Sequence, residues 1–275
     1  MSELVKKLKN AARIEAPPLG FAGVNRKQEK PRPVLVARAS GDEKQALSLV
    51  EGADAVFIDT HQEEVADRFI KQLAKDKVVM PYGCWLGNNS GCQNDFYALN
   101  LDADMCQLKK TKAGKALVVE PEIEDKFLRQ LDDLPVDAVV IEGREGHACR
   151  LTIKNYMLCR RLAIAINKPL LIRVDLKIDA RDMEEMWDYG IDGFVVDVDP
   201  AVPSAVKDLR KVIDNLDLDS HRKKISLSPI IPSVKSSLPS SPEPVPDEDE
   251  DDDDYDEYYL TGLMVKQRLA FTCQP

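Results

Sequence analysis

Eight short apolar runs recur between residues 33 and 199, and they constrain the fold more than any other feature of the sequence. Most are separated by segments whose apolar residues lie three and four apart, the spacing of a helix with one buried face. Strands this apolar need cover on both faces, so the alternation predicts a parallel sheet covered by helices. The runs are 33–39, 53–59, 78–82, 95–101, 116–120, 136–142, 169–175 and 193–199.

Eight strand–helix units in about 185 residues fit a compact barrel. An open, doubly wound sheet is the alternative, but no Gly-x-Gly-x-x-Gly follows the first run, which disfavours its dinucleotide-binding version. The connections 83–94 and 102–114 are short and poor in helical pattern. We therefore predict an α/β protein with a single (β/α)8 barrel of TIM type.

The segments on either side of the barrel differ from it in composition. Residues 1–32 begin with an amphipathic helix over 2–14, with Ser2 as its N-cap, and continue as a polar connector to the barrel at 33–219. Residues 220–275 are rich in Ser and Pro and contain the acidic run DEDEDDDDYDE at 247–257. We predict that this tail is disordered, because such a composition buries too little apolar surface to offset the entropy of ordering.

The charge balance excludes some functions. The chain has 48 Asp and Glu against 38 Lys and Arg, and ten of the carboxylates lie in 247–257, which leaves 38 against 38 elsewhere. A neutral fold argues against a basic surface for nucleic acid. No apolar run reaches the ~20 residues that span a bilayer, and the N-terminus lacks a secretory signal pattern. The six cysteines include no Cys-x-x-Cys pair, so we expect reduced thiols and a cytoplasmic location.

Polar side chains end the strands on one face. Side chains alternate between faces along a strand, and in each run one phase is uniformly apolar while the other starts apolar and ends polar. In a barrel the second phase is the interior, and the carboxyl ends of the strands are where active sites form. The polar residues are Arg38, Asp59, Tyr82, Asn100, Glu120, Glu142, Arg173 with Asp175, and Asp197 with Asp199.

This predicted ring carries an excess of negative charge. Five carboxylates, those of Asp59, Glu120, Glu142, Asp175 and Asp197, face two arginines. Crowded carboxylates raise one another's pKa unless a cation, bound water, a cationic ligand or protonation intervenes. Oxygen-only ligands suit Mg²⁺ or Mn²⁺, and a site would use Glu120, Glu142, Asp175 and Asp197. The alternative is a salt-bridge network that closes the barrel without any cofactor.

Three residues are candidates for catalysis. His147, in the EGREGH segment after the sixth run, could transfer a proton, although an exposed loop histidine has the same sequence signature. Glu142 could also transfer a proton, and the planar guanidinium of Arg173 could orient a substrate carboxylate. No predicted inner position carries Lys, which disfavours a Schiff-base mechanism.

Residues 169–199, PLLIRVDLKIDARDMEEMWDYGIDGFVVDVD, resemble the last strand–helix–strand unit of aldolase-type and ribulose-phosphate-binding barrels, with GIDG at 190–193. The resemblance implies the barrel fold. Those families tend to bind phosphate on glycine-rich turns after strands 7 and 8. Here the turns begin with Asp175 and Asp197 and contain no glycine, so we expect no standard phosphate site.

Two functions fit these patterns. The first is a divalent-metal-assisted lyase or isomerase that binds a small oxygenated substrate at the carboxyl-terminal mouth of the barrel. The second is a non-catalytic barrel that acts as a scaffold, whose N-terminal helix docks one partner and whose acidic tail recruits a basic protein. The fold does not decide between them.

Overall fold

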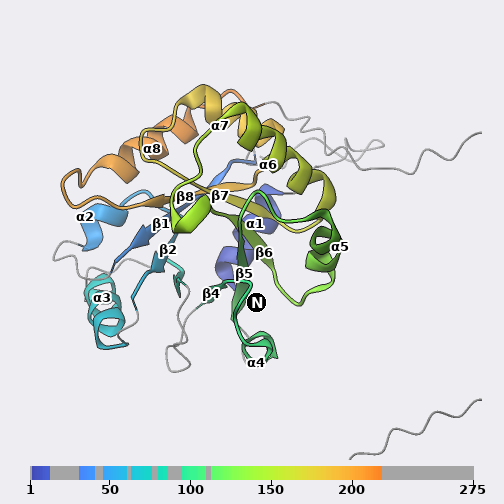
Figure 1. Ribbon diagram of the computed structural model, residues 1–275. Coiled ribbons are helices and arrows are strands. Elements are labelled where there is room, and N and C mark those ends of the chain that lie inside the picture. Colours follow the sequence, from blue (N-terminus) through green and yellow to red (C-terminus); the bar gives the residue numbers. More distant parts are fainter. Residues whose placement is uncertain are drawn as a thin grey trace, which may run out of the picture. The chain divides into compact units, whose positions relative to one another are not determined.

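The computed structural model describes residues 2–12, 31–40, 46–60, 63–75, 80–85, 95–109 and 113–218. The chain divides into two units, Met1–Ser228 and Pro229–Pro275, and every described residue belongs to the first. The predicted disordered tail at 220–275 therefore lies outside the described residues. Within the first unit, eight parallel strands pair in chain order and the last pairs with the first, which closes a barrel (Figure 1).

Each of the eight predicted runs contains a strand or overlaps one, so the predicted barrel is confirmed. The third strand begins later than predicted, at Tyr82. The strands are β1 Val34–Ala39, β2 Ala55–Ile58, β3 Tyr82–Cys84, β4 Phe96–Leu99, β5 Gly114–Val119, β6 Ala138–Ile141, β7 Leu170–Val174 and β8 Gly193–Asp197.

Helices follow most of the strands and lie outside the barrel (Figure 1). The connections between the runs that show helical spacing all contain a helix, and one further short helix, α4, lies in the connection after β4. The helices of the barrel are α2 Ala46–Val50, α3 Glu63–Lys75, α4 Met105–Lys109, α5 Asp125–Asp133, α6 Ile153–Ala165, α7 Ala180–Asp188 and α8 Ala205–Asp214, with a 3-10 turn, η1, at Arg144–Gly146. No described helix is long and apolar enough to cross a membrane.

The side chains that point outward from the strands form one core layer with these helices. Val139, Ile172 and Val196 project outward and share a buried cluster with Leu162 of α6 and Met183 of α7. Burial of aliphatic side chains on both sides of this layer is the main force that holds the helices on the barrel.

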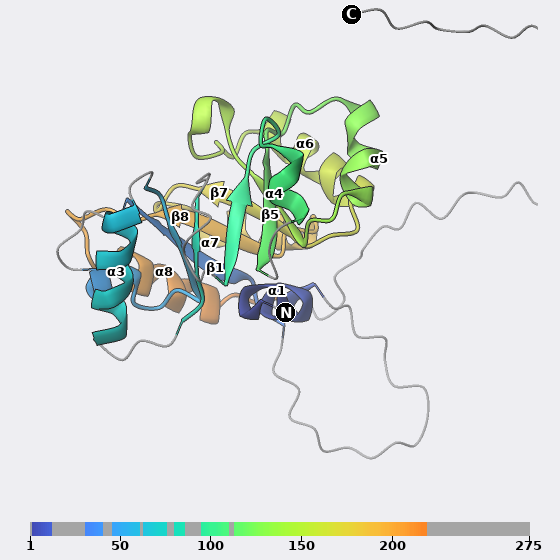
Figure 2. The same cartoon turned by 90° about the horizontal axis from the view of Figure 1, so that it is seen from below.

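The N-terminal helix, α1 Glu3–Ala11, packs against the barrel instead of offering its apolar face to a partner (Figure 2). Leu4, Leu8 and Ala11 are buried with the inward side chains of the strands. Ser2 is the N-cap, as predicted, and its hydroxyl donates a hydrogen bond of 2.6 Å to Asp95, directly before β4. The apolar face of this helix is therefore already used within the chain, and docking of a partner by the helix stays a prediction.

The prediction of which side chains face into the barrel is confirmed on seven strands and is wrong on β3. Tyr82 pairs with Val56 and packs in the outer cluster, so the inward residues of this strand are Gly83 and the following Trp85. A register difference of one residue moves every side chain of a strand to the other face. A Cβ atom on Gly83 would collide with the backbone and ring of Phe96, which explains why glycine occupies this inward position.

Candidate functional site

Five charged residues at the carboxyl ends of the strands form a chain of ion pairs, here called the charge network. In spatial order it runs Asp59, Arg38, Asp197, Arg173, Glu142. Arg38 on β1 pairs with Asp59, which directly follows β2, and donates a hydrogen bond of 3.1 Å to Asp197 on β8. Arg173 on β7 pairs with Glu142, which directly follows β6, and also with Asp197.

Asp197 is the centre of the network. Its Oδ1 accepts hydrogen bonds from Arg38 Nη1 at 3.1 Å and from Arg173 Nε at 3.2 Å. Its Oδ2 accepts a bond of 2.6 Å from Arg173 Nη2, so Arg173 binds the carboxylate with two nitrogens. The side chain of Asp197 is nevertheless 46% exposed, so this carboxylate also faces solvent.

The guanidinium of Arg173 is committed to protein groups. Its side chain is 7% exposed, and its bonds to Asp197, Glu142 and the backbone oxygen of Gly146 use four of its five N–H donors. Burial opposes the charge, but the two carboxylates raise the pKa of Arg173, so it stays cationic. The predicted role, in which Arg173 orients a substrate carboxylate, does not fit this geometry because few donors remain for a substrate.

Glu142 is the buried acid of the network. Its side chain is 8% exposed. Burial raises the pKa of Glu142 above its usual range, although the positive charge of Arg173 acts in the opposite direction. A carboxyl group with a raised pKa is suited to donate and accept a proton nearer to neutral pH.

Aromatic side chains lie beside the network inside the barrel. The guanidinium of Arg38 lies over the ring of Trp85 at 4.8 Å, and Trp85 meets Phe57 edge-on at 4.9 Å. The stacking stabilises the cation where water is excluded. Trp85 was not among the predicted inward residues because β3 was assigned the wrong phase, although a tryptophan three residues after the apolar run is a visible signal.

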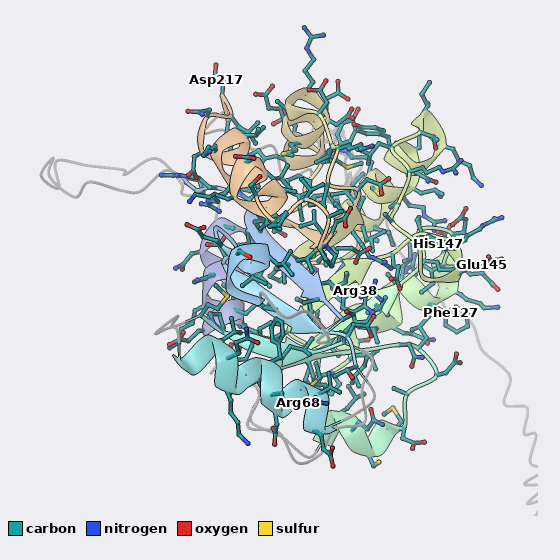
Figure 3. All side chains as sticks on the ribbon, turned by 90° about the vertical axis from the view of Figure 1, so that its left-hand side faces the viewer. Arg38, Arg68, Phe127, Glu145, His147 and Asp217 are labelled. Carbon is teal, nitrogen blue, oxygen red and sulfur yellow. The ribbon has the colours of Figure 1, made fainter. Side chains whose placement is uncertain are left out.

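The other predicted site residues lie outside the network. Glu120 and Asp175 are exposed at the ends of β5 and β7. His147 is exposed after η1, and Figure 3 shows it beside Glu145 at the edge of the molecule. Tyr82 faces outward, as described above, and Asn100 is exposed.

The predicted metal site does not form from its four carboxylates. Glu142 and Asp197 are brought together, but the guanidinium of Arg173 lies between them, where a cation would be expected. Glu120 and Asp175 do not join them. Within the part of the chain that the structure describes, no three His, Cys, Asp or Glu side chains are grouped so that they could hold a metal ion.

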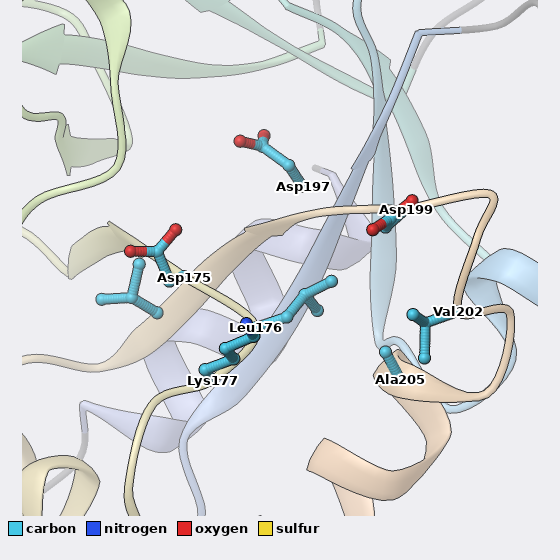
Figure 4. Close-up of a pocket in the computed structure, with 8 residues that line it drawn as sticks. Asp175, Leu176, Lys177, Asp197, Asp199, Val202 and Ala205 are labelled. Atoms are coloured by element: carbon cyan, nitrogen blue, oxygen red, sulfur yellow. The ribbon is translucent and has the colours of Figure 1, made fainter.

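A pocket of about 560 Å³ opens beside the network, between the segments that follow β7 and β8 (Figure 4). This volume lies within the range of small-molecule sites. Three carboxylates, those of Asp175, Asp197 and Asp199, and the amine of Lys177 line it, which leaves a formal charge of about −2. Its apolar walls are formed by Val174, Leu176, Val202 and Ala205.

Solved structures of tryptophan synthase alpha subunits from Pyrococcus furiosus are similar to this chain. A single-residue mutant of the isolated subunit has a TM-score of 0.50 at 14% identity, and the match covers 67% of this chain and 98% of that one. The match to the tryptophan synthase complex has a TM-score of 0.50 at 14% identity, and it covers 67% of this chain and 97% of that one. The likeness is one of fold. It agrees with the barrel of TIM type predicted from the sequence. No protein-family model matches the sequence, and no curated protein matches it.

Proposed function

We propose that the carboxyl-terminal mouth binds a small neutral or cationic ligand that carries hydroxyl or amino groups, and catalyses acid–base chemistry of the lyase or isomerase type on it. The observation that carries this proposal is the position of Asp197, which lines the pocket and is also the centre of the charge network.

The charges of the pocket select the ligand. Carboxylates accept hydrogen bonds, so Asp175, Asp197 and Asp199 favour a ligand that donates them. A phosphate or carboxylate on the ligand would meet a negative lining, and the guanidinium groups of Arg38 and Arg173 are already bound to protein carboxylates. A neutral or cationic ligand therefore suits the site better than an anionic one.

The acid–base role falls to Glu142. Lyase and isomerase reactions need a group that takes up and returns a proton, and burial raises the pKa of Glu142 in the direction that favours this role. Arg173 joins Glu142 to Asp197 and so to the pocket wall. We assign no step to a metal ion, because the guanidinium of Arg173 already lies between these two carboxylates.

Three sugars that share one hexose ring and differ in charge test the charge preference. Glucosamine, glucose and glucose 6-phosphate are cationic, neutral and anionic, and their affinities are measured by calorimetry on the wild type, Asp197→Asn and Asp208→Asn. We expect glucosamine to bind most tightly and glucose 6-phosphate least, and Asp197→Asn to weaken the first. Asp208, on the exposed face of α8, is the control. Tightest binding of glucose 6-phosphate, or no effect of Asp197→Asn, would contradict the proposal.

A non-catalytic scaffold is the second candidate, and one observation favours it. Ile153 and Met157 lie one helical turn apart on α6 and are 83% and 70% exposed, which is typical of a protein contact. Deleting residues 247–257 separates the two candidates: ligand binding at the mouth should survive, whereas recruitment of a basic partner should be lost.

A further inference from the structure

Arg173 joins two carboxylates that lie in different surroundings. Its Nη1 donates a hydrogen bond to Glu142, and its Nε and Nη2 donate to Asp197 at 3.2 and 2.6 Å. The side chain of Glu142 is 8% exposed, whereas that of Asp197 is 46% exposed and lines the pocket (Figure 4). A ligand in the pocket can therefore contact Asp197, and a single guanidinium group separates that carboxylate from Glu142.

The charged groups around Glu142 come from the neighbouring strands and from the segment that follows β6. They are Arg173 on β7, Asp197 on β8, Arg38 on β1, Asp59 after β2, Glu120 and Glu122 after β5, and Arg144, Glu145 and His147 after β6. Glu120 and the three residues after β6 are exposed, where water and salt screen their charges. The charges that act most directly on Glu142 are therefore those of the network.

The members of the network act on Glu142 in opposite directions. Burial raises the pKa of Glu142, the guanidinium groups of Arg173 and Arg38 lower it, and the negative charge of Asp197 raises it again. A cation that binds Asp197 balances this negative charge, and its own positive charge also favours the ionised form of Glu142. Both effects stabilise the carboxylate relative to the acid, so a cation in the pocket favours loss of the proton.

We propose that a cationic ligand bound at Asp197 makes Glu142 release its proton to the solvent, so that the ligand generates the base that its own reaction needs. This coupling rests on the proposed function, because it uses the same pocket and the same acid–base group. A neutral ligand leaves the negative charge of Asp197 in place and does not cause the release. By linkage, a cationic ligand binds more tightly where Glu142 is already ionised.

A first experiment introduces the cation without a ligand. Val202 lines the pocket and is 50% exposed, so Val202→Lys places an amine there. Val212→Lys is the matched control, because Val212 is also exposed and lies about two turns along α8 from the pocket. NMR titration of the carboxyl carbon, assigned with Glu142→Gln, measures the pKa of Glu142, and circular dichroism establishes that each variant is folded. We expect Val202→Lys to lower this pKa and Val212→Lys to leave it at the wild-type value.

A second experiment uses a ligand whose charge does not titrate. Choline has a permanent positive charge and a hydroxyl group, and dimethylbutanol has the same shape with a carbon atom in place of the charged nitrogen. Calorimetry in two buffers of different ionisation enthalpy measures the protons released on binding, at the pH where Glu142 is half protonated. We expect choline to release protons from the wild type and from Glu124→Gln, an exposed control, but not from Glu142→Gln. Dimethylbutanol should release none, and choline should bind about fivefold or more tightly above this pH than below it.

The two experiments separate the coupling from the proposed function. The coupling is overturned if Val202→Lys leaves the pKa of Glu142 unchanged. It is also overturned if choline binds without releasing protons, or releases as many from Glu142→Gln as from the wild type. If Val202→Lys lowers the pKa but choline binds no better than dimethylbutanol, the proposed ligand preference fails, and the lysine variant supports the coupling between the pocket and Glu142.

Discussion

Replacing Arg173 by methionine tests whether the charge network is held as a buried unit. The substitution keeps an unbranched side chain but leaves Glu142 buried without its cation. Breaking a buried ion pair by removing one partner costs about 3–5 kcal/mol, a large share of the roughly 5–15 kcal/mol by which a domain is stable. The bond to the half-exposed Asp197 adds about 1 kcal/mol or less. At roughly 2–4 °C per kcal/mol, a total loss of about 3–6 kcal/mol should lower the Tm by about 6–24 °C.

The loss should depend on pH, and its sign follows from Glu142. The pKa of this group is raised in the folded protein above its usual 4.5, so the folded state binds the extra proton more readily than the unfolded chain. The stability linked to this group is therefore complete below pH 4.5 and is lost as the pH rises through the folded pKa. Without Arg173 the carboxylate loses its main opposing attraction, so Arg173→Met should be more destabilised at pH 8 than at pH 5.

Urea unfolding followed by circular dichroism at both pH values measures these effects. Glu142→Gln in the Arg173→Met background removes the stranded charge and should recover most of the loss at pH 8. Arg32→Met is the matched control, because Arg32 and Asp214 form an exposed pair at 2.7 Å that contributes about 1 kcal/mol or less. The reasoning fails if Arg173→Met costs no more than Arg32→Met, or if its cost is the same at both pH values.

Two further pairs of substitutions test the packing that supports the site. Leu8→Ala should lower the free energy of unfolding by about 2–5 kcal/mol because it opens a cavity at the barrel end. Met157→Ala, on the exposed face of α6, should change this free energy by about 0.5 kcal/mol or less. Urea titrations of the two variants measure both changes. Gly190→Ala should cost more than Gly146→Ala. Both glycines have a positive φ, but a Cβ at Gly190 would lie 2.8 Å from that of Ala163, while none at Gly146 meets an atom within 4 Å. Equal losses for the two glycine variants would contradict this reasoning.

The strands were predictable from sequence because apolar runs and helical spacing are local signals. The faces were predictable where a run alternates clearly, as in residues 136–142, where Val140 faces inward and Val139 outward. The third run, VVMPY, has Tyr82 as its one polar side chain, which is a weak sign of alternation, and the pairing of Tyr82 with Val56 sets which residues face inward. That pairing is a contact between strands, which a local pattern does not reveal. Because the predicted inward positions of β3 were one residue off, the inward position of Trp85 was not recognised.

The sequence predicts which charged residues lie at the carboxyl ends of the strands, but not the bonds between them. The sequence places Glu142, Arg173 and Asp197 at the same end of the barrel, but a guanidinium group there can bind a substrate or a neighbouring carboxylate. The choice depends on atomic positions: Arg173 reaches both carboxylates and Gly146 at once. The same contacts place a guanidinium where a divalent ion was expected, and Glu120 and Asp175 stay at the surface.

The order of strands in a closed barrel explains why this network forms. Going around the barrel, β6, β7, β8, β1 and β2 are consecutive neighbours, and they end in Glu142, Arg173, Asp197, Arg38 and Asp59. The charges alternate, so each arginine has a carboxylate on both sides, and the pairing of β8 with β1 makes the series continuous. Three carboxylates against two guanidinium groups leave one negative charge, at a mouth whose adjoining pocket is also acidic. A cationic ligand would reduce this excess and an anionic one would increase it, so the barrel order itself favours the ligand charge proposed for the site.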